Sequence, residues 1–210
     1  MTSAPVLGSA PARRRDRQKE QTRLDLALAA FELAKARGLA GVRVPEIAAA
    51  VGVSTRTFNN YFTSKEAAIV WPTTLRAARL AEYVTSQPPA EPLAEVLVAA
   101  FGELYGETDM DGLPDGWLRD FRALAAAEPA LHGEFLKAAS ATEVALADAI
   151  ADRTGTATGT LRALVLANVA VAAERAAILF WSRQATRPAP LADVVRTSVG
   201  MAVRGLADAC

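Results

Sequence analysis

The stretch V-R-V-P-E-I-A-A-A-V-G-V-S-T-R-T-F-N-N-Y-F-T-S-K-E-A, from Val42 to Ala67, decides the fold of this chain. Residues 46–51 place apolar side chains on one helical face, and Pro45 suits a first helical turn because its missing N–H would be unpaired there. Gly52 supplies the backbone freedom for a chain reversal. Ser54 is a good N-cap for a following helix. The stretch therefore predicts two short helices joined by a tight turn.

The second of these helices has one aromatic side and one polar side. Phe58 and Phe62 are four residues apart and are expected to point inward. The opposite side carries the polar residues Thr55, Arg56, Thr57, Asn59, Asn60 and Tyr61. This is the layout of a helix-turn-helix, in which the second helix enters the major groove of DNA.

The stretch from Pro45 to Ala67 resembles the helix-turn-helix of the tetracycline-repressor (TetR) family of bacterial regulators. The shared features are the A-x-x-x-G-V-S turn, the aromatic pair at the end of the second helix and the S-K-E that opens the next helix. The resemblance is specific over about Arg17 to Ala68 and loose beyond. It implies an all-α homodimeric transcriptional regulator, usually a repressor, with about nine helices and a three-helix DNA-binding domain. The ligand-binding and dimerisation domain would follow.

A weaker resemblance concerns the C-terminal half. The segments E-P-A-L-H-G-E-F (128–135), A-L-A-D-A-I-A-D-R-T-G (145–155) and A-A-E-R-A-A-I-L-F-W (172–181) are similar to the actinobacterial TetR subgroup that includes the mycofactocin-system regulators. That resemblance implies a small, largely apolar or acyl-CoA-like effector.

The distribution of charge agrees with a DNA-binding N-terminal part. The net charge of the whole chain is zero, which alone does not favour a nucleic-acid binder. Residues 1–65, however, carry 11 Lys and Arg against 5 Asp and Glu, a net charge of +6, and residues 66–210 carry −6. The positive part coincides with the helix-turn-helix, as a phosphate-facing domain requires.

Candidate DNA-binding residues come from this helix-turn-helix and from a basic run before it. Arg43 stands where the family usually has a capping Thr; an arginine cannot cap in that way but can reach a phosphate. We expect Arg56 to pair with guanine and Asn59 or Asn60 with adenine. The predicted DNA-binding residues are Arg14, Arg15, Arg17, Arg43, Thr55, Arg56, Thr57, Asn59, Asn60, Tyr61 and Lys65, of which Tyr61 and Lys65 would fix phosphates.

The pattern along the chain predicts three parts. These are a disordered N-terminal arm (1–12), a helix-turn-helix DNA-binding domain (13–66) and a ligand-binding and dimerisation domain (67–210). The first helix is expected over Asp16–Arg37, and a connector helix, with Pro72 inside it, begins at Ser64. Five more helices are predicted, at Glu91–Tyr105, Pro114–Ala127, Pro129–Arg153, Ala157–Arg183 and Leu191–Ala209.

The helix over residues 157–183 is apolar on nearly every side. A helix that is apolar all round is expected to be buried all round, with one face in the domain interior and the other against a second subunit. The last helix repeats the pattern. The sequence therefore predicts a homodimer through a four-helix interface made by the last two helices of each chain.

The ligand is expected among helices four to eight, in an apolar site with a few polar groups. Asn168 and Arg175 interrupt the apolar helix and share a face, so either could orient a polar group; ion pairs at the surface are the alternative for Arg175 and its neighbour Glu174. The predicted ligand-binding residues are Phe101, Tyr105, Trp117, Phe121, Asn168 and Arg175.

Other classes of protein are less favoured. A single cysteine and a single histidine argue against a disulfide, a zinc site or His-based catalysis. We therefore expect that the protein is not an enzyme and that it holds neither a cofactor nor a metal ion. The candidate catalytic residues, which include no nucleophile–base pair, are Glu103, Asp109, Asp111, Asp120 and Arg122. A helical interaction or scaffold protein without sequence-specific DNA binding is the main alternative. We expect a cytoplasmic protein, because no uncharged run approaches the roughly 18 residues of a membrane span and no signal peptide is apparent.

Overall fold

The structure is a computed structural model and describes residues 10–105, 112–114, 116–184, 186 and 189–205. Within these residues the fold is all-α, as predicted, with nine helices and one short 3₁₀ turn. The elements are α1 (Ala10–Arg37), η1 (Leu39–Gly41), α2 (Val44–Ala50), α3 (Thr55–Tyr61), α4 (Lys65–Ser86), α5 (Leu93–Glu103), α6 (Trp117–Ala127), α7 (Pro129–Thr154), α8 (Leu161–Arg183) and α9 (Leu191–Arg204).

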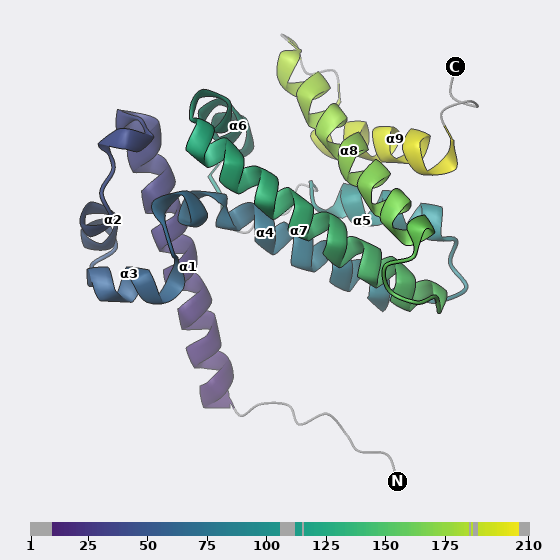
Figure 1. Cartoon of the computed structure of the whole chain (residues 1–210), viewed down its shortest axis with the longest axis horizontal. Helices are drawn as coiled ribbons and strands as arrows, with labels where there is room; N and C mark the ends of the chain where they lie inside the picture. The colour runs from purple at the N-terminus through teal and green to yellow at the C-terminus, as the bar shows by residue number, and fades with distance from the viewer. Residues whose placement is uncertain (1–9, 106–111, 115, 185, 187–188, 206–210) are drawn as a thin grey trace.

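The first helix is longer than expected. It begins at Ala10 instead of Asp16 and so includes the last three residues of the predicted disordered arm; residues 1–9 lie outside the described part. No glycine interrupts the chain between Ala10 and Arg37, and Pro11 is tolerated because it lies in the first turn. Figure 1 shows the N-terminal half of α1 extending past α3, away from the remaining helices. The basic run is therefore carried on a helix.

Several C-terminal helices are shorter than predicted. The eighth helix begins at Leu161, four residues later than expected, because the Thr160 side chain caps it by accepting from the Ala163 amide. The last helix ends at Arg204, and the rest of the prediction for it, residues 206–209, lies outside the described part.

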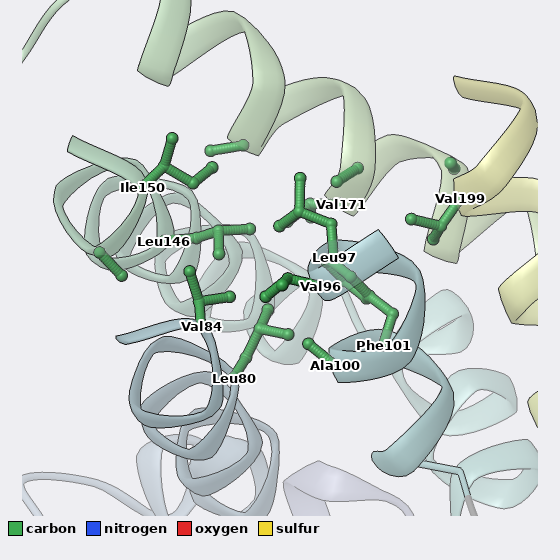
Figure 2. Packing of buried hydrophobic residues seen from close by; sticks show 14 of the residues in the cluster. Leu80, Val84, Val96, Leu97, Ala100, Phe101, Leu146, Ile150, Val171 and Val199 are labelled. Carbon is green, nitrogen blue, oxygen red and sulfur yellow. The ribbon is translucent and has the colours of Figure 1, made fainter. Parts of the chain in front are cut away.

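One hydrophobic core joins α4, α5, α7, α8 and α9. Figure 2 shows side chains from all five helices meeting: Leu80 and Val84 of α4 lie against Leu146 and Ile150 of α7, while α5, α8 and α9 close the other side. In Figure 1, α4 and α7 run side by side across the middle of the molecule. This packing surrounds the C-terminal part of the connector helix.

A second core lies beneath the helix-turn-helix, but it does not belong to α1, α2 and α3 alone. It contains Phe31, Ile47 and Phe58 from these helices, and residues 68–71 from the first turns of α4. Trp117 and other side chains of α6 and α7 complete it. The two predicted domains therefore share buried side chains.

Helix α8 is buried on only one face in this single chain. Ala163, Ala167 and Ala170 face the core, whereas a row of apolar residues on the other face is exposed: Leu161, Val165, Val169, Leu179 and Phe180. Helix α8 is long and apolar enough to cross a membrane, but the core helix of a soluble protein can have the same length and composition. Helix α8 packs against α7 and α9. The predicted burial of one face in the domain interior is therefore confirmed, and burial of the other face against a second subunit stays a prediction.

Candidate DNA-binding and ligand-binding sites

The turn between α2 and α3 has the geometry that the sequence predicts. Gly52 has φ +73°, a conformation that glycine adopts without strain, and the Val53 amide donates to the Ala48 carbonyl over 2.9 Å. The Ser54 hydroxyl accepts from the Thr57 amide over 3.1 Å and so caps α3. These contacts fix the direction of α3 relative to α2.

Helix α3 is held from below by aromatic packing. Phe58 is fully buried, and its ring centroid lies 5.7 Å from that of Phe62. The Phe62 ring in turn meets the edge of Trp71 in α4 at 6.0 Å. Because the side of α3 that carries Phe58 and Phe62 is anchored in the core, the opposite side of the helix faces solvent.

The exposed side of α3 carries the polar residues that the sequence predicts for base contact. Thr55, Arg56, Asn59 and Asn60 are exposed. Thr57, predicted to face the DNA, and Tyr61, predicted to contact a phosphate, are half-buried: the Thr57 hydroxyl lies 2.9 Å from that of Ser54, and Tyr61 packs against the core.

Arg43 precedes α2 and is exposed, without a side-chain cap to the helix. Its backbone amide instead donates to Glu46 over 3.0 Å, and the Glu46 carboxylate also accepts from Arg37 over 3.1 Å. Glu46 thus satisfies the backbone amide of the N-cap residue itself, and the Arg43 guanidinium lies in solvent.

Lys65 has internal partners that sequence reasoning missed. Its ammonium is half-buried and donates to the carbonyls of Leu39, over 2.6 Å, and Val42, over 2.9 Å. A lysine has three N–H donors, so a phosphate contact would use the third. Lys65 therefore ties the start of α4 to the loop before α2.

Basic residues on α1 flank this surface. Arg14, Arg15 and Arg17 are exposed on the protruding N-terminal part. Arg23, which the sequence did not single out, stacks its guanidinium 4.8 Å from the ring centroid of Trp71 and 5.5 Å from that of Phe62. This cation–π contact fixes α1 against the aromatic support of α3.

A mainly apolar cavity of about 70 Å³ lies between α4, α6, α7 and α8. Its lining comprises Thr73, Ala77, Leu80, Leu104, Tyr105, Leu118, Phe121, Arg122, Phe135, Ala139, Thr142, Val171, Glu174 and Arg175. The Tyr105 hydroxyl donates to the Glu174 carboxylate, and Arg175 lies 3.8 Å from Glu143 of α7. The cavity thus combines aromatic walls with a few charged groups.

A second cavity, of about 200 Å³, adjoins the first. Both are lined by Tyr105, Leu118 and Arg122, which therefore form the wall between them. The second cavity is completed by Gly116 and Arg119 at the start of α6 and by residues of α8 and α9.

The structure brings together three of the six predicted ligand residues. Tyr105, Phe121 and Arg175 line the first cavity. Phe101 and Trp117 are instead buried in the two cores, and neither lines either cavity. Asn168 is exposed, and its side-chain amide donates to the Leu164 carbonyl of its own helix.

Helix α6 contacts α1 directly. Lys35 of α1 lies 3.4 Å from Asp120 of α6. The neighbouring Arg119 lowers the pKa of Asp120, with Lys35 contributing, and the hydrogen bond to Glu32, followed by that to Asp120, raises the pKa of Lys35. The pair is therefore charged at neutral pH.

The exposed faces of α8 and α9 form an apolar groove of about 510 Å³. It is lined by Ala176, Ala177, Phe180, Ala189, Asp193, Val194, Thr197, Ser198 and Met201. Phe180 and Met201 are large apolar side chains that are exposed to solvent in the single chain. Within that part, no group of three or more His, Cys, Asp or Glu residues is arranged to hold a metal ion; Asp109 and Asp111 lie outside it.

A helix-turn-helix with an exposed polar recognition helix, attached to a helical domain with an internal cavity, defines a class of DNA-binding transcriptional regulators. Residues 27–68 match the family of bacterial regulatory proteins described as the tetR family, and residues 91–207 match the MftR C-terminal domain. The chain therefore belongs to the TetR family of transcriptional regulators, with a C-terminal domain of the MftR type. This family comprises regulators, not enzymes.

Individual relatives agree. The HTH-type transcriptional regulator TcmR of Streptomyces glaucescens is 29% identical over 144 residues, which are 67% of this chain and 64% of TcmR. A solved TetR-family regulator from Rhodococcus is 17% identical, with a TM-score of 0.55 over 88% of this chain and 99% of that one. Thermus thermophilus FadR, a TetR-family repressor solved with lauroyl-CoA, is 23% identical, with a TM-score of 0.51 over 88% and 94% of the two chains. The solved structures share the fold.

Proposed function

We propose that the protein is a ligand-responsive transcriptional repressor that acts in the cytoplasm and binds a near-palindromic operator as a homodimer. The observation that carries the proposal is the exposed polar side of α3, held in place by the buried Phe58 and Phe62. A rigid recognition helix with free amide and guanidinium groups is what major-groove readout requires.

In this proposal the exposed residues of α3 read bases. Arg56 pairs with guanine O6 and N7, and Asn59 or Asn60 pairs with adenine N6 and N7, while Thr55 and Thr57 lie at the groove edge. The remaining predicted residues contact phosphates and set the register: Arg14, Arg15, Arg17, Arg43, Tyr61 and the third N–H of Lys65. The α1 helix, because it extends past α3, would carry its arginines along the DNA backbone (Figure 1).

Dimerisation would bury the groove of α8 and α9. Two copies of Phe180, Met201 and the exposed row on α8 would pack together as a four-helix interface, so that apolar surface now exposed leaves water. A two-fold dimer would place two α3 helices in successive major grooves, which matches a near-palindromic site.

The ligand would enter the cavities beside Tyr105. In this structure the two cavities are about 70 and 200 Å³, smaller than the roughly 300–1,000 Å³ of ordinary ligand pockets. An effector must therefore separate α4, α6 and α7 to fit. This gives the ligand-bound state a different geometry, and a ligand that prefers it would shift the protein away from the operator-binding state. The lauroyl-CoA bound by the FadR relative makes an acyl-CoA a rational first probe.

The test is selection of operators from random duplex DNA with the full-length protein, followed by titration with lauroyl-CoA. We expect a two-fold-related consensus, with affinity that falls steeply as salt rises, and weaker binding when lauroyl-CoA is present. Failure to enrich any sequence would overturn the proposal and favour a helical interaction protein. If the operator is bound but lauroyl-CoA has no effect on binding, only the proposed ligand class is wrong. Mass spectrometry of small molecules that co-purify with the protein would then identify a different candidate effector.

A further inference from the structure

Leu39 is held from two sides, at the point where the ligand-binding helices meet the DNA-binding helices. Its backbone amide donates to the Glu128 Oε1 over 2.9 Å, and its carbonyl accepts from the Lys65 Nζ over 2.6 Å. Glu128 is the single residue between α6 and α7, and Lys65 is the first residue of α4. One short segment thus joins the corner between α6 and α7 to the start of the connector helix.

The Glu128 bond replaces a partner that the local backbone does not provide. Leu39 begins the 3₁₀ turn η1, and the first amides of such a turn have no acceptor within it. The residue is only 4% exposed, so water is largely excluded. A carboxylate that accepts from a buried backbone amide makes a charge-assisted bond, which is stronger than a neutral one. Losing it would therefore loosen the loop between α1 and α2.

The corner that carries Glu128 is also bound to the cavity wall. Phe121 of α6 and Phe135 of α7 both line the first cavity, with ring centroids 5.6 Å apart. Trp117 stacks on Phe121 at 5.0 Å and meets Phe31 of α1 at 5.7 Å. A change in the separation of the two phenylalanines would therefore move the corner between α6 and α7 and, through Trp117, shift the contact with α1.

We propose that Glu128 is a positioning residue that sets the orientation of the helix-turn-helix from the ligand-binding side, in addition to α4 and to the contacts of Asp120 and Trp117 with α1. A ligand that separates Phe121 from Phe135 moves the corner, withdraws Glu128 from Leu39 and releases the loop before α2. This last step rests on the proposed function, whereas the positioning role stands on the contacts of Leu39 in the structure.

Hydrogen exchange of the full-length protein, followed by mass spectrometry, tests the positioning role without an operator or a ligand. The variants are Glu128→Ala, Glu128→Gln, which retains an oxygen that can accept from the Leu39 amide, and Glu134→Ala. Glu134 is a matched control because it is a glutamate near the start of α7, the helix that Glu128 precedes, and its carboxylate pairs with Lys137 instead of Leu39. We expect Glu128→Ala to lose protection in residues 38–44 and 55–61 while residues 191–204 stay protected. Glu128→Gln should restore most of the protection, and Glu134→Ala should resemble the wild type.

The outcomes separate a positioning role from a local or global one. Faster exchange at 38–44 alone would mean that Glu128 only caps the 3₁₀ turn, and faster exchange everywhere would mean general destabilisation; either result overturns the inference. On an operator selected with the wild type, Glu128→Ala should weaken binding about 2- to 30-fold, with Glu128→Gln closer to the wild type. If the wild type selects no operator, the proposed function fails, but the exchange result still decides the role of Glu128.

Discussion

The Arg153 guanidinium of α7 donates a hydrogen bond to the Gln87 carbonyl over 2.7 Å, just past the end of α4. The same guanidinium donates to the carbonyls of Pro88, Glu91 and Val84, over 2.7, 2.8 and 3.3 Å. One cation thus satisfies four carbonyl oxygens and fastens the far end of the connector helix to α7.

Removal of this cation should destabilise the protein. We expect Arg153→Ala to lower the free energy of unfolding by about 1.5–3 kcal/mol, since several half-buried carbonyls lose a charged partner. Arg153→Lys should retain only part of the stability that Arg153 contributes, because an ammonium lacks the planar fork of donors of a guanidinium. Urea denaturation measures both. Arg162→Ala, at an exposed arginine of α8, is the control and should stay within about 0.5 kcal/mol; equal losses at both positions would contradict this account.

Asn59 is the sharpest test of base reading by α3. Asn59→Ala should cost about 1–3 kcal/mol of binding at its own base pair and relax the preference there, with little effect on non-specific DNA. Titration of the selected operator and of a scrambled duplex measures the difference. Asn168→Ala, at an exposed asparagine on α8, should leave both affinities unchanged. Equal weakening of Asn59→Ala on the two duplexes would remove its base-reading role.

Lys65 should influence both DNA affinity and stability. If its third N–H meets a phosphate, Lys65→Ala weakens binding to every sequence alike and lowers the slope of log affinity against log salt by about one. Because the ammonium also holds the carbonyls of Leu39 and Val42, the variant should lose about 1–3 kcal/mol of stability. Lys137→Ala, at an exposed ion pair of α7, should change neither quantity. A stability loss with an unchanged salt slope would leave Lys65 with the internal role alone.

Phe180 tests the dimer. Its side chain is 55% exposed in the single chain, and a carboxylate placed there would have to be buried without a partner on dimerisation. We expect Phe180→Glu to sediment as a monomer at micromolar concentrations at which the wild type is a dimer. Leu136→Glu is the matched control, because Leu136 is 49% exposed but lies on α7. A monomeric wild type would refute the predicted interface.

Trp117 tests the packing between α6 and α1. Its indole N–H is buried with no hydrogen-bond partner among the described residues, while its ring stacks on Phe121 and meets Phe31. Trp117→Ala should cost about 3–5 kcal/mol of stability. Trp117→Phe keeps an aromatic ring and removes the unpaired donor, so we expect a loss below about 1.5 kcal/mol. Thermal unfolding of the two variants checks this; equal losses would mean that ring stacking contributes little.

The helix-turn-helix could be predicted from sequence because its determinants are local. Gly52 and Ser54 act on backbone groups within a few residues of themselves, and the spacing of Phe58 and Phe62 places both rings on one side of the helix. The exposed polar side of α3 follows from the same spacing. Helix ends were less accurate, as at the starts of α1 and α8.

The cavity residues were harder to predict, because a buried aromatic ring can face a core or a cavity. Phe101 and Phe121 were both predicted to contact the ligand, but only Phe121 lines the cavity, whereas Phe101 is buried in the core. Asn168 and Arg175 share a helical face, yet the long arginine side chain reaches the cavity while the short amide bonds to its own helix. Contacts such as that between Leu39 and Glu128, 89 residues apart, leave no local pattern.

The shared core beneath the helix-turn-helix restricts how the molecule can be divided. A fragment cut after Glu66 would keep Phe31 and Phe62 but would lose Trp71 and Trp117, which lie against them. Such a fragment would present aromatic surface to water and tend to aggregate. Chimeric regulators built by exchanging the helix-turn-helix domain after residue 66 would therefore need residues on α6 that match the exchanged domain. For this chain, a graft would have to carry the first turns of α4, helix α6 and the start of α7 together with α1, α2 and α3, because all of them contribute buried side chains to this core.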